Sequence, residues 1–388
     1  MLKAIAASST DKNALDAGRQ TGQQITTQLA LPKISLIYAS CDYNLEDVFK
    51  GFKSSAPNVP FIGNTSFTGV ITPSGIVEGA DGFIGALAIE DDALIVGVAG
   101  LEKKGSALET GREVAKKAMA KAAKLTPPAF FYMVASPGEE EFYLKGITEV
   151  IGRVPCFGGS AADNSINGDW KLYADDLITA DGVAVAFFYT SKPFANYYTG
   201  AYRETSDVGI ITKVADNRIL AEIDGEPALN NYASWRKIPT DKLKGMDLLV
   251  ASVTSPLGVK DRLGDLVAIR HPMAGNDDLT MAVGNNLSEG TAVIRMECTQ
   301  DELVASASEA LTTLIKKAPF DPGAFLLVHC GGRRAGIDDR LGEVAQNLKK
   351  VAGDVPFICQ FTFGEYGFEQ DDRNTCGGLM LSYTALAK

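Results

Sequence analysis

Histidine and tryptophan are scarce in this sequence, and cysteine is sparse and unpaired. The 388 residues include 2 His, 2 Trp and 6 Cys, with no C-x-x-C pair. So few histidines argue against a zinc site of the usual histidine-rich kind. The cysteine spacing is typical of buried thiols in a reducing compartment rather than of a disulfide framework. We therefore expect no metal, no cofactor and no disulfide bonds.

Targeting signals, membrane segments and basic tracts are also missing. Residues 1–10 are too short and too mixed in polarity for a signal peptide, and no run of 18 apolar residues occurs. The net charge is −11 and the Lys and Arg residues are scattered, which argues against a nucleic-acid groove. Phosphate-loop, dinucleotide and nucleophile-elbow motifs are absent too. We expect a cytoplasmic protein with neither a membrane nor a nucleic acid as partner.

The sequence does contain a short phrase that is written three times. Each phrase starts with Val-Pro and follows a helix-like segment, which itself follows a hydrophobic run. The phrases are residues 59–64, 154–159 and 355–360, and the runs are residues 34–40, 129–136 and 324–330. Strand, helix and Val-Pro strand thus recur, which predicts an α/β fold of duplicated strand–helix–strand units in mixed sheets.

Helix faces of small residues support the same interpretation. The faces of the first two copies are Ala14, Gly18, Gly22, Ile25, Leu29 and Ala107, Gly111, Ala115, Ala118, Ala122. Their spacing keeps one side of each helix towards a core, and Gly and Ala there permit close approach of helix and sheet backbones. The third copy is looser, with Leu303, Ala307, Ala310 and Leu314.

A different kind of sequence separates the second and third copies. Between about residues 199 and 300, short β-type runs alternate with turn residues, and Pro227 is placed to start a short helix. The expected strands are 208–214, 218–224, 248–252, 266–269, 279–283 and 291–296. We expect a duplicated α/β domain at 1–198 and a second domain at 199–388. The second domain opens with a β-rich portion, 199–300, and closes with a third α/β unit, 301–388.

Several phrases, taken in order, give the chain a resemblance to the FIST family (F-box and intracellular signal transduction). Residues 154–163 and 181–185 resemble the N-terminal FIST region. The C-terminal FIST region is resembled by residues 223–229, 271–272, 288–290, 330–334 and 363–365. The resemblance implies a FIST N-like domain at 1–198, a FIST C-like domain at 199–388, and a ligand-sensing role in signal transduction. The implied ligands are amino acids or similar metabolites.

The expected module stands alone, because no kinase, cyclase, methyl-accepting or F-box output region is attached to it. A sensor of this kind needs a separate downstream signalling protein, which the sequence does not identify. A homodimer is also possible if one sheet edge stays open.

One candidate ligand site follows the Val-Pro strand of the second copy. Its residues are Gly158, Gly159, Ser160, Asp163 and Asn164, whose backbone amides would line an anion-friendly turn. The alternative is that the glycines only permit a tight turn. Residues 163–168 also resemble the start of a calcium loop, but Ser165 and Ala174 stand where ligating groups belong, so that motif fails.

The stronger candidate follows the strand of the third copy, where open α/β sheets usually bind ligands. It comprises Cys330, Gly331, Arg333 and Arg334, with Glu365 at the end of the next strand. An arginine suits a carboxylate and a glutamate suits an ammonium group, which predicts an amino acid or related zwitterion as ligand. Alternatively, both arginines are solvated helix-start residues that pair with Asp338 or Asp339.

Two other functions remain open. A Cys-dependent hydrolase or transferase would need Cys330 to recruit His271, because neighbouring strand residues such as His329 and Cys330 point to opposite faces. A protein-interaction adaptor without a ligand would need an exposed apolar surface. We assign no catalytic residue and expect a sensor rather than an enzyme.

Overall fold

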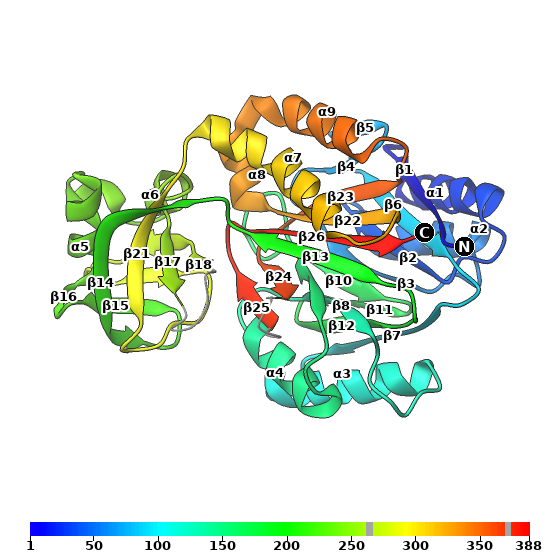
Figure 1. Cartoon of the computed structure of the whole chain (residues 1–388), viewed down its shortest axis with the longest axis horizontal. Coiled ribbons are helices and arrows are strands. Elements are labelled where there is room, and N and C mark those ends of the chain that lie inside the picture. The colour runs from blue at the N-terminus through cyan, green and yellow to red at the C-terminus, as the bar shows by residue number, and fades with distance from the viewer. Residues whose placement is uncertain (261–266, 369–373) are drawn as a thin grey trace.

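Three similar α/β units form the bulk of the computed structural model, which describes residues 1–260, 267–368 and 374–388 (Figure 1). The first unit comprises β1 (Lys3–Ser9), α1 (Ala14–Gln28), β2 (Ile34–Ala39), α2 (Leu45–Ser55), β3 (Phe61–Thr65), β4 (Val70–Thr72), β5 (Gly75–Val77) and β6 (Ile84–Glu90). The second comprises β7 (Ile95–Glu102), α3 (Ala107–Lys121), β8 (Phe130–Ala135), α4 (Glu140–Ile151), β9 (Cys156–Ser160), β10 (Leu172–Ala174), β11 (Leu177–Thr179) and β12 (Gly182–Tyr189).

The third unit has the same order of elements but is interrupted after its first strand. It comprises β13 (Phe194–Thr199), α7 (Gln300–Lys317), β22 (Pro322–Cys330), α8 (Gly331–Ile337), the 3-10 turn η2 (Asp338–Arg340), α9 (Leu341–Ala352), β23 (Phe357–Thr362), β24 (Glu365–Phe368), β25 (Asn374–Gly377) and β26 (Leu381–Ala387). The predicted α/β class with mixed sheets is confirmed.

The three sheets are built on one plan and exchange hairpins. Their strand orders are β1-β6-β2-β3-β10-β11, β7-β12-β8-β9-β24-β25 and β13-β26-β22-β23-β4-β5. In each sheet the third and fourth strands are parallel, and the remaining pairs are antiparallel. The hairpin of each unit (β4–β5, β10–β11 or β24–β25) thus belongs to the sheet of another unit. Strands from both sides of residue 198 therefore share sheets, because β13 pairs with β26 and β24 pairs with β9.

Pairs of helices cover the outside of the sheets, and the inner faces of all three sheets share one core (Figure 1). The small helix faces bring paired helices into contact. A Cβ atom on Gly18 of α1 would lie 1.9 Å from the carbonyl oxygen of Val48 in α2, and one on Gly51 of α2 would lie 1.9 Å from that of Leu15. Gly111 and Gly146 make the same close approach between α3 and α4. Glycine is required there because any side chain would overlap the neighbouring backbone.

The β-rich portion is an insertion between β13 and α7, and it forms the separate lobe at the left of Figure 1. It comprises β14 (Arg203–Ala215), β15 (Ile219–Ile223), β16 (Glu226–Pro227), α5 (Ala228–Arg236), η1 (Thr240–Leu243), α6 (Asp247–Ala251), β17 (Leu257–Lys260), β18 (Val267–Arg270), β19 (Pro272–Gly275), β20 (Met281–Val283) and β21 (Ala292–Glu297). Its sheet runs β18-β17-β21-β14-β15-β20-β19. The two edge strands are joined by His271 alone, so the sheet curls until its edges nearly meet.

Most expected elements of the insertion are present, with one error. The helix after Pro227 is confirmed as α5, but of residues 248–252, expected as a strand, 248–251 belong to the helix α6 and Ser252 caps it. A short apolar run does not distinguish a buried strand from a short helix. The strand expected at 266–269 is β18, which begins at Val267; residue 266 lies outside the described residues.

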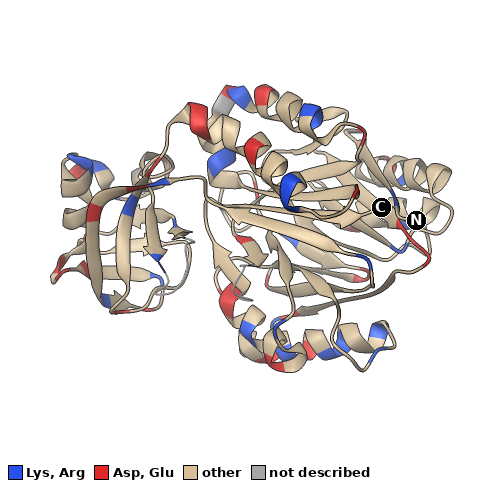
Figure 2. Cartoon of the chain, in the orientation of Figure 1, with Lys and Arg blue, Asp and Glu red and all other residues tan. Residues whose placement is uncertain are grey.

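The distribution of charged residues and the hydropathy of the helices add two further observations. Figure 2 shows Lys and Arg intermixed with Asp and Glu along the outer helices. Within the described residues, no helix is long and apolar enough to cross a membrane.

Candidate functional site

A cavity of about 440 Å³ lies between the insertion and the three-unit core. The core contributes the ends of its strands, including Cys330 at the end of β22 and Gly331 after it, and the loops around Gly138 and Trp170. The insertion contributes α6 and the strands β19 and β20. Its side chains there are largely apolar: Leu249, Val250, Val253, Met273 and Val283. The volume falls in the lower part of the range for small-molecule sites, about 300–1,000 Å³.

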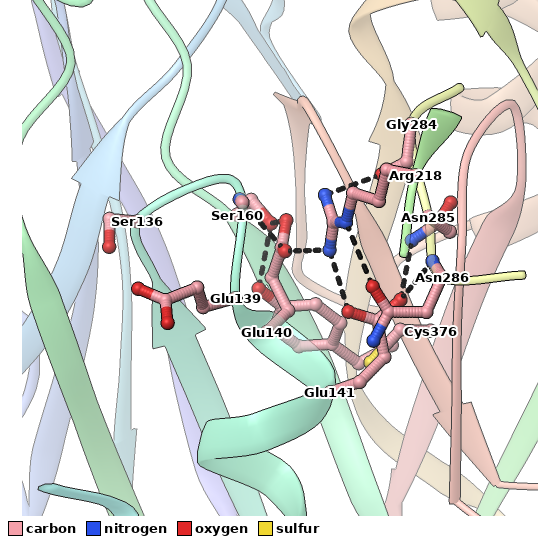
Figure 3. Close-up of polar contacts among 12 residues, drawn as sticks. Ser136, Glu139, Glu140, Glu141, Ser160, Arg218, Gly284, Asn285, Asn286 and Cys376 are labelled. Atoms are coloured by element: carbon pink, nitrogen blue, oxygen red, sulfur yellow. Dashed lines mark hydrogen bonds and ion pairs between the residues drawn. The ribbon is translucent and has the colours of Figure 1, made fainter. Parts of the chain in front are cut away.

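An ionic cluster forms one wall of this cavity and joins its two sides (Figure 3). The Nη2 atom of Arg218, in the insertion, lies 2.6 Å from Glu140 Oε2 and 2.6 Å from Glu141 Oε2, both at the start of α4. Nη1 of Arg218 donates to the carbonyl oxygen of Gly284 at 2.7 Å. The other oxygen of Glu141 accepts from the backbone N–H of Asn286 at 3.0 Å. The cluster therefore fixes the insertion to the second unit.

The two glutamates of the cluster differ in environment. Glu140 is 1% exposed, and burial raises the pKa of its carboxyl group although the charge of Arg218 opposes this. Burial also disfavours the charge of Glu141. There, however, Arg218 and the N–H of Asn286 outweigh burial and lower the pKa. Glu140 is held further by Ser160, whose hydroxyl donates to Oε1 at 2.9 Å, and by the N–H of Gly138 at 2.9 Å. The site thus contains a positioned carboxylate and a positioned guanidinium.

Cys330 and His271 line the same cavity but are poorly suited to covalent chemistry. Burial, followed by the charge of Glu365, raises the pKa of the Cys330 thiol far above its usual value. The sulfur accepts a hydrogen bond from the N–H of Leu379 at 3.3 Å. Burial lowers the pKa of His271 to about 4, and its Nε2 lies 3.0 Å from the carbonyl oxygen of Leu249. A neutral imidazole and a protonated thiol are the resting forms of this pair.

The expected arginine–glutamate pair lies behind the cavity wall. Arg333 is fully buried and donates to the carbonyl oxygen of Gly200 at 2.7 Å and to the hydroxyl of Ser306 at 2.5 Å. Glu365 is also fully buried, and burial raises the pKa of its carboxyl group to about 8. Its oxygens accept from the Thr362 hydroxyl at 2.8 Å and the N–H of Met380 at 2.9 Å. Among the described residues that line the cavity, neither side chain occurs, and Arg334 does not occur either.

Other parts of the fold approach Gly158 and Gly159 of the second copy too closely for a side chain. Gly158 has φ +135°, and a Cβ there would lie 1.9 Å from the carbonyl oxygen of Met133; one on Gly159 would lie 2.7 Å from Cγ2 of Thr362. Both glycines lie within strand β9 and permit close packing of that strand, rather than forming the tight turn that the sequence offered as the alternative.

The polar residues after these glycines shape the loop at 163–169. The Asp163 carboxylate accepts from the backbone N–H groups of Ser165, Ile166, Gly168 and Asp169. Asn164 accepts from the N–H of Thr68 at 2.9 Å and donates to Asp42 at 2.7 Å. The loop leads directly to Trp170, so these residues position the cavity wall.

Sequence reasoning missed Glu140, Glu141 and Arg218. A signal for the glutamates was present, because the acidic run 139–141 follows the strand of the second copy at the point where the third copy has its glycines and arginines. Nothing local marked Arg218, which follows an ordinary turn at Asp216 and Asn217. Within the described part of the chain, no group of three or more His, Cys, Asp or Glu residues is arranged to hold a metal ion.

Comparison with known families gives matches over most of the chain. The FIST N domain matches residues 33–226 and the FIST C domain matches residues 228–367. No curated protein sequence matches the chain.

Solved structures give only weak likenesses. Cyanuric acid hydrolase from A. caulinodans is 10% identical with a TM-score of 0.37, over 100% of both chains. Phosphoribosylformylglycinamidine synthase II from Thermotoga maritima is 9% identical with a TM-score of 0.24, over 99% of this chain and 72% of that one. We draw no conclusion about fold or activity from similarities at this level.

Proposed function

Because the chain belongs to the FIST family, whose domains are signal-transduction sensor domains, we propose that its ligand binds in the cavity between the insertion and the core. The observation that carries this proposal is the position of the Glu140–Arg218 pair. An acidic and a basic side chain line one largely apolar cavity and belong to different parts of the fold. Such a cavity suits a small molecule with an apolar body and a charged head.

The ligand class we propose is an amino acid or a related zwitterion. Arg218 is the candidate partner for a carboxylate and Glu140 the candidate partner for an ammonium group. These two residues take the roles that the sequence suggested for Arg333 and Glu365. Binding would partly replace the contacts between Arg218 and the glutamates, so that the ligand competes with the link between insertion and core.

This arrangement supplies a way to pass on the signal. A ligand that contacts both the insertion and the core stabilises one relative position of these two parts over the others. We propose that a separate downstream protein reads this change in the cytoplasm. The six cysteines, all of them free, are compatible with a reducing compartment. β1, β7 and β13 end their sheets, and an edge of this kind offers a route to a homodimer.

A thermal-shift screen with a blocked cavity tests the proposal. The screen compares the twenty amino acids and small carboxylates on the wild type and on Ala335→Trp, which places a large ring at the cavity wall. A ligand at about 100 times its Kd adds about 2.7 kcal/mol to the free energy of unfolding, which raises Tm by a few degrees. We expect such a shift for the wild type and none for Ala335→Trp.

The matched control is Ala120→Trp on the exposed side of α3, which should keep the full shift. A screen in which nothing stabilises the wild type, or in which Ala335→Trp responds like the control, contradicts the proposed site.

A further inference from the structure

Three aromatic side chains, one from each α/β unit, meet at the core side of the cavity. Phe67 follows β3, Trp170 precedes β10, and Phe363 follows β23. The ring centroids of Phe67 and Phe363 lie 6.0 Å apart with planes at 47°, and those of Trp170 and Phe363 lie 6.2 Å apart with planes at 87°. The rings are therefore inclined to one another and form a concave corner rather than a flat stack.

These rings are fixed in place although each is only partly buried. The backbone N–H of Phe67 donates to the carbonyl oxygen of Phe361 at 3.0 Å, and Nε1 of Trp170 donates to that of Ala180 at 3.2 Å. Gly331 leaves room for Phe363, because a Cβ at that glycine would lie 3.2 Å from the phenyl ring. Since the indole N–H is already paired, the corner offers apolar surface and π faces to a ligand, not a hydrogen bond.

The opposite wall is different in chemistry. It is aliphatic, with Leu249 and Val253 from the α6 region and Met273 from β19. The ionic cluster of Glu140 and Arg218 closes one side of the same space. An aromatic ring gains about 0.5–1.5 kcal/mol from stacked or edge-to-face contacts beyond the burial of its area, whereas a saturated ring of similar size gains only the burial. A corner of three inclined rings provides both contact geometries at once.

We propose that the ligand of this cavity carries an aromatic or heteroaromatic ring, which packs into the corner formed by Phe67, Trp170 and Phe363 while its charged head faces Glu140 and Arg218. This inference rests on the proposed function and makes it more specific. The ring is the determinant of specificity, and the head can be an amine, a carboxylate or both.

Trp170 provides a direct reporter. The chain has 2 Trp, so Trp235→Phe in the full-length protein leaves Trp170 as the single indole. Its fluorescence is titrated with three matched pairs: L-phenylalanine and L-cyclohexylalanine, 2-phenylethylamine and 2-cyclohexylethylamine, and phenylacetate and cyclohexylacetate. We expect the aromatic member of at least one pair to change the fluorescence and to bind about three- to tenfold more tightly than its saturated partner.

Variants of the corner separate the ring contact from general burial. Phe363→Leu and, independently, Phe67→Leu keep an apolar side chain and should abolish the preference for the aromatic member. Phe320→Leu, an aromatic substitution away from the cavity, should keep the preference. The melting temperature of each variant reports whether it is folded.

Equal affinities within every pair, or a preference that survives in both corner variants, would overturn the inference while leaving the proposed cavity site intact. If no compound of any pair, and no amino acid in the thermal-shift screen, affects the wild type, both proposals fail.

Discussion

Arg333 is fully buried, and its guanidinium donates hydrogen bonds within the protein rather than to a ligand in the cavity. An arginine after a strand suits a ligand carboxylate, yet here its guanidinium bonds to Gly200 and Ser306 and lies 5.5 Å from the ring centre of Tyr202. It ties the connection between β13 and β14 to α7. The sequence shows an arginine just after this strand but does not reveal its direction, because the path of the chain into helix α8 decides which way the side chain points.

Glu365 makes a pH-dependent contribution to stability. Burial raises the pKa of its carboxyl group from 4.5 to about 8, so the folded state holds a proton that the unfolded state releases above pH 4.5. Its contribution is fully present below pH 4.5 and is lost as the pH rises to about 8. Each pKa unit corresponds to about 1.4 kcal/mol.

We therefore expect Glu365→Gln to gain stability relative to the wild type as the pH increases from 5 to 8.5. Urea unfolding at several pH values measures this. The difference between the two proteins removes the opposite trend of His271, whose depressed pKa favours folding as the pH rises from about 4 to 6.5. Parallel stability profiles would show that Glu365 is ionised in the fold.

We expect the thiol of Cys330 to react slowly with alkylating agents. Its raised pKa keeps it protonated at neutral pH, and alkylation requires the thiolate. Iodoacetamide labelling at pH 7, followed by peptide mass spectrometry, should be no faster at Cys330 than for a model thiol with a pKa near 8.5. His271→Ala should not change the rate. Rapid labelling that depends on His271 would instead support the Cys-dependent enzyme.

At the scale of elements, the helix pairs depend on glycine contacts. In Gly18→Ala the added Cβ would overlap the carbonyl of Val48, and the helices α1 and α2 must separate. We expect a loss of about 1–3 kcal/mol in the free energy of unfolding, more than the gain in helix propensity. Gly342→Ala on α9 is the control, because a Cβ there has no atom within 4 Å. That variant should be unchanged or more stable by up to about 1 kcal/mol. If both variants behave alike in urea unfolding, close helix packing is not the reason for the glycine.

The elements themselves were largely predictable, for physical reasons that also explain the failures. The helix face, the hydrophobic run and the Val-Pro strand of each copy are local patterns, and in the first copy they correspond to α1, β2 and β3. The hairpins β4–β5 and β10–β11 have three-residue strands, which contain no information about the sheet they join. The Glu140–Arg218 contact joins residues that are 78 positions apart in the sequence, so no local pattern predicts it.

At the scale of the whole molecule, the insertion interrupts the third unit with its ends side by side. Arg203 at its start pairs with Glu297 at its end. Replacing residues 204–296 by a short Gly-containing turn should therefore leave the three interlocked sheets intact, with one cooperative unfolding transition.

A fragment of residues 1–198 should not fold stably, because it lacks the strands β23 and β24 on which its hairpin and its second sheet depend. Circular dichroism melting distinguishes the outcomes, and a cooperatively folded 1–198 fragment would contradict the interlocked arrangement.

The central claim is that one ligand touches both the insertion and the core in the cavity between them. The most direct measurement is a crystal structure of the full chain with the compound that gives the largest thermal shift. We expect its density between Phe363 and Leu249, with its charged head within hydrogen-bond distance of Arg218 or Glu140. Density at any other place on the molecule, with this cavity left empty, would contradict the account.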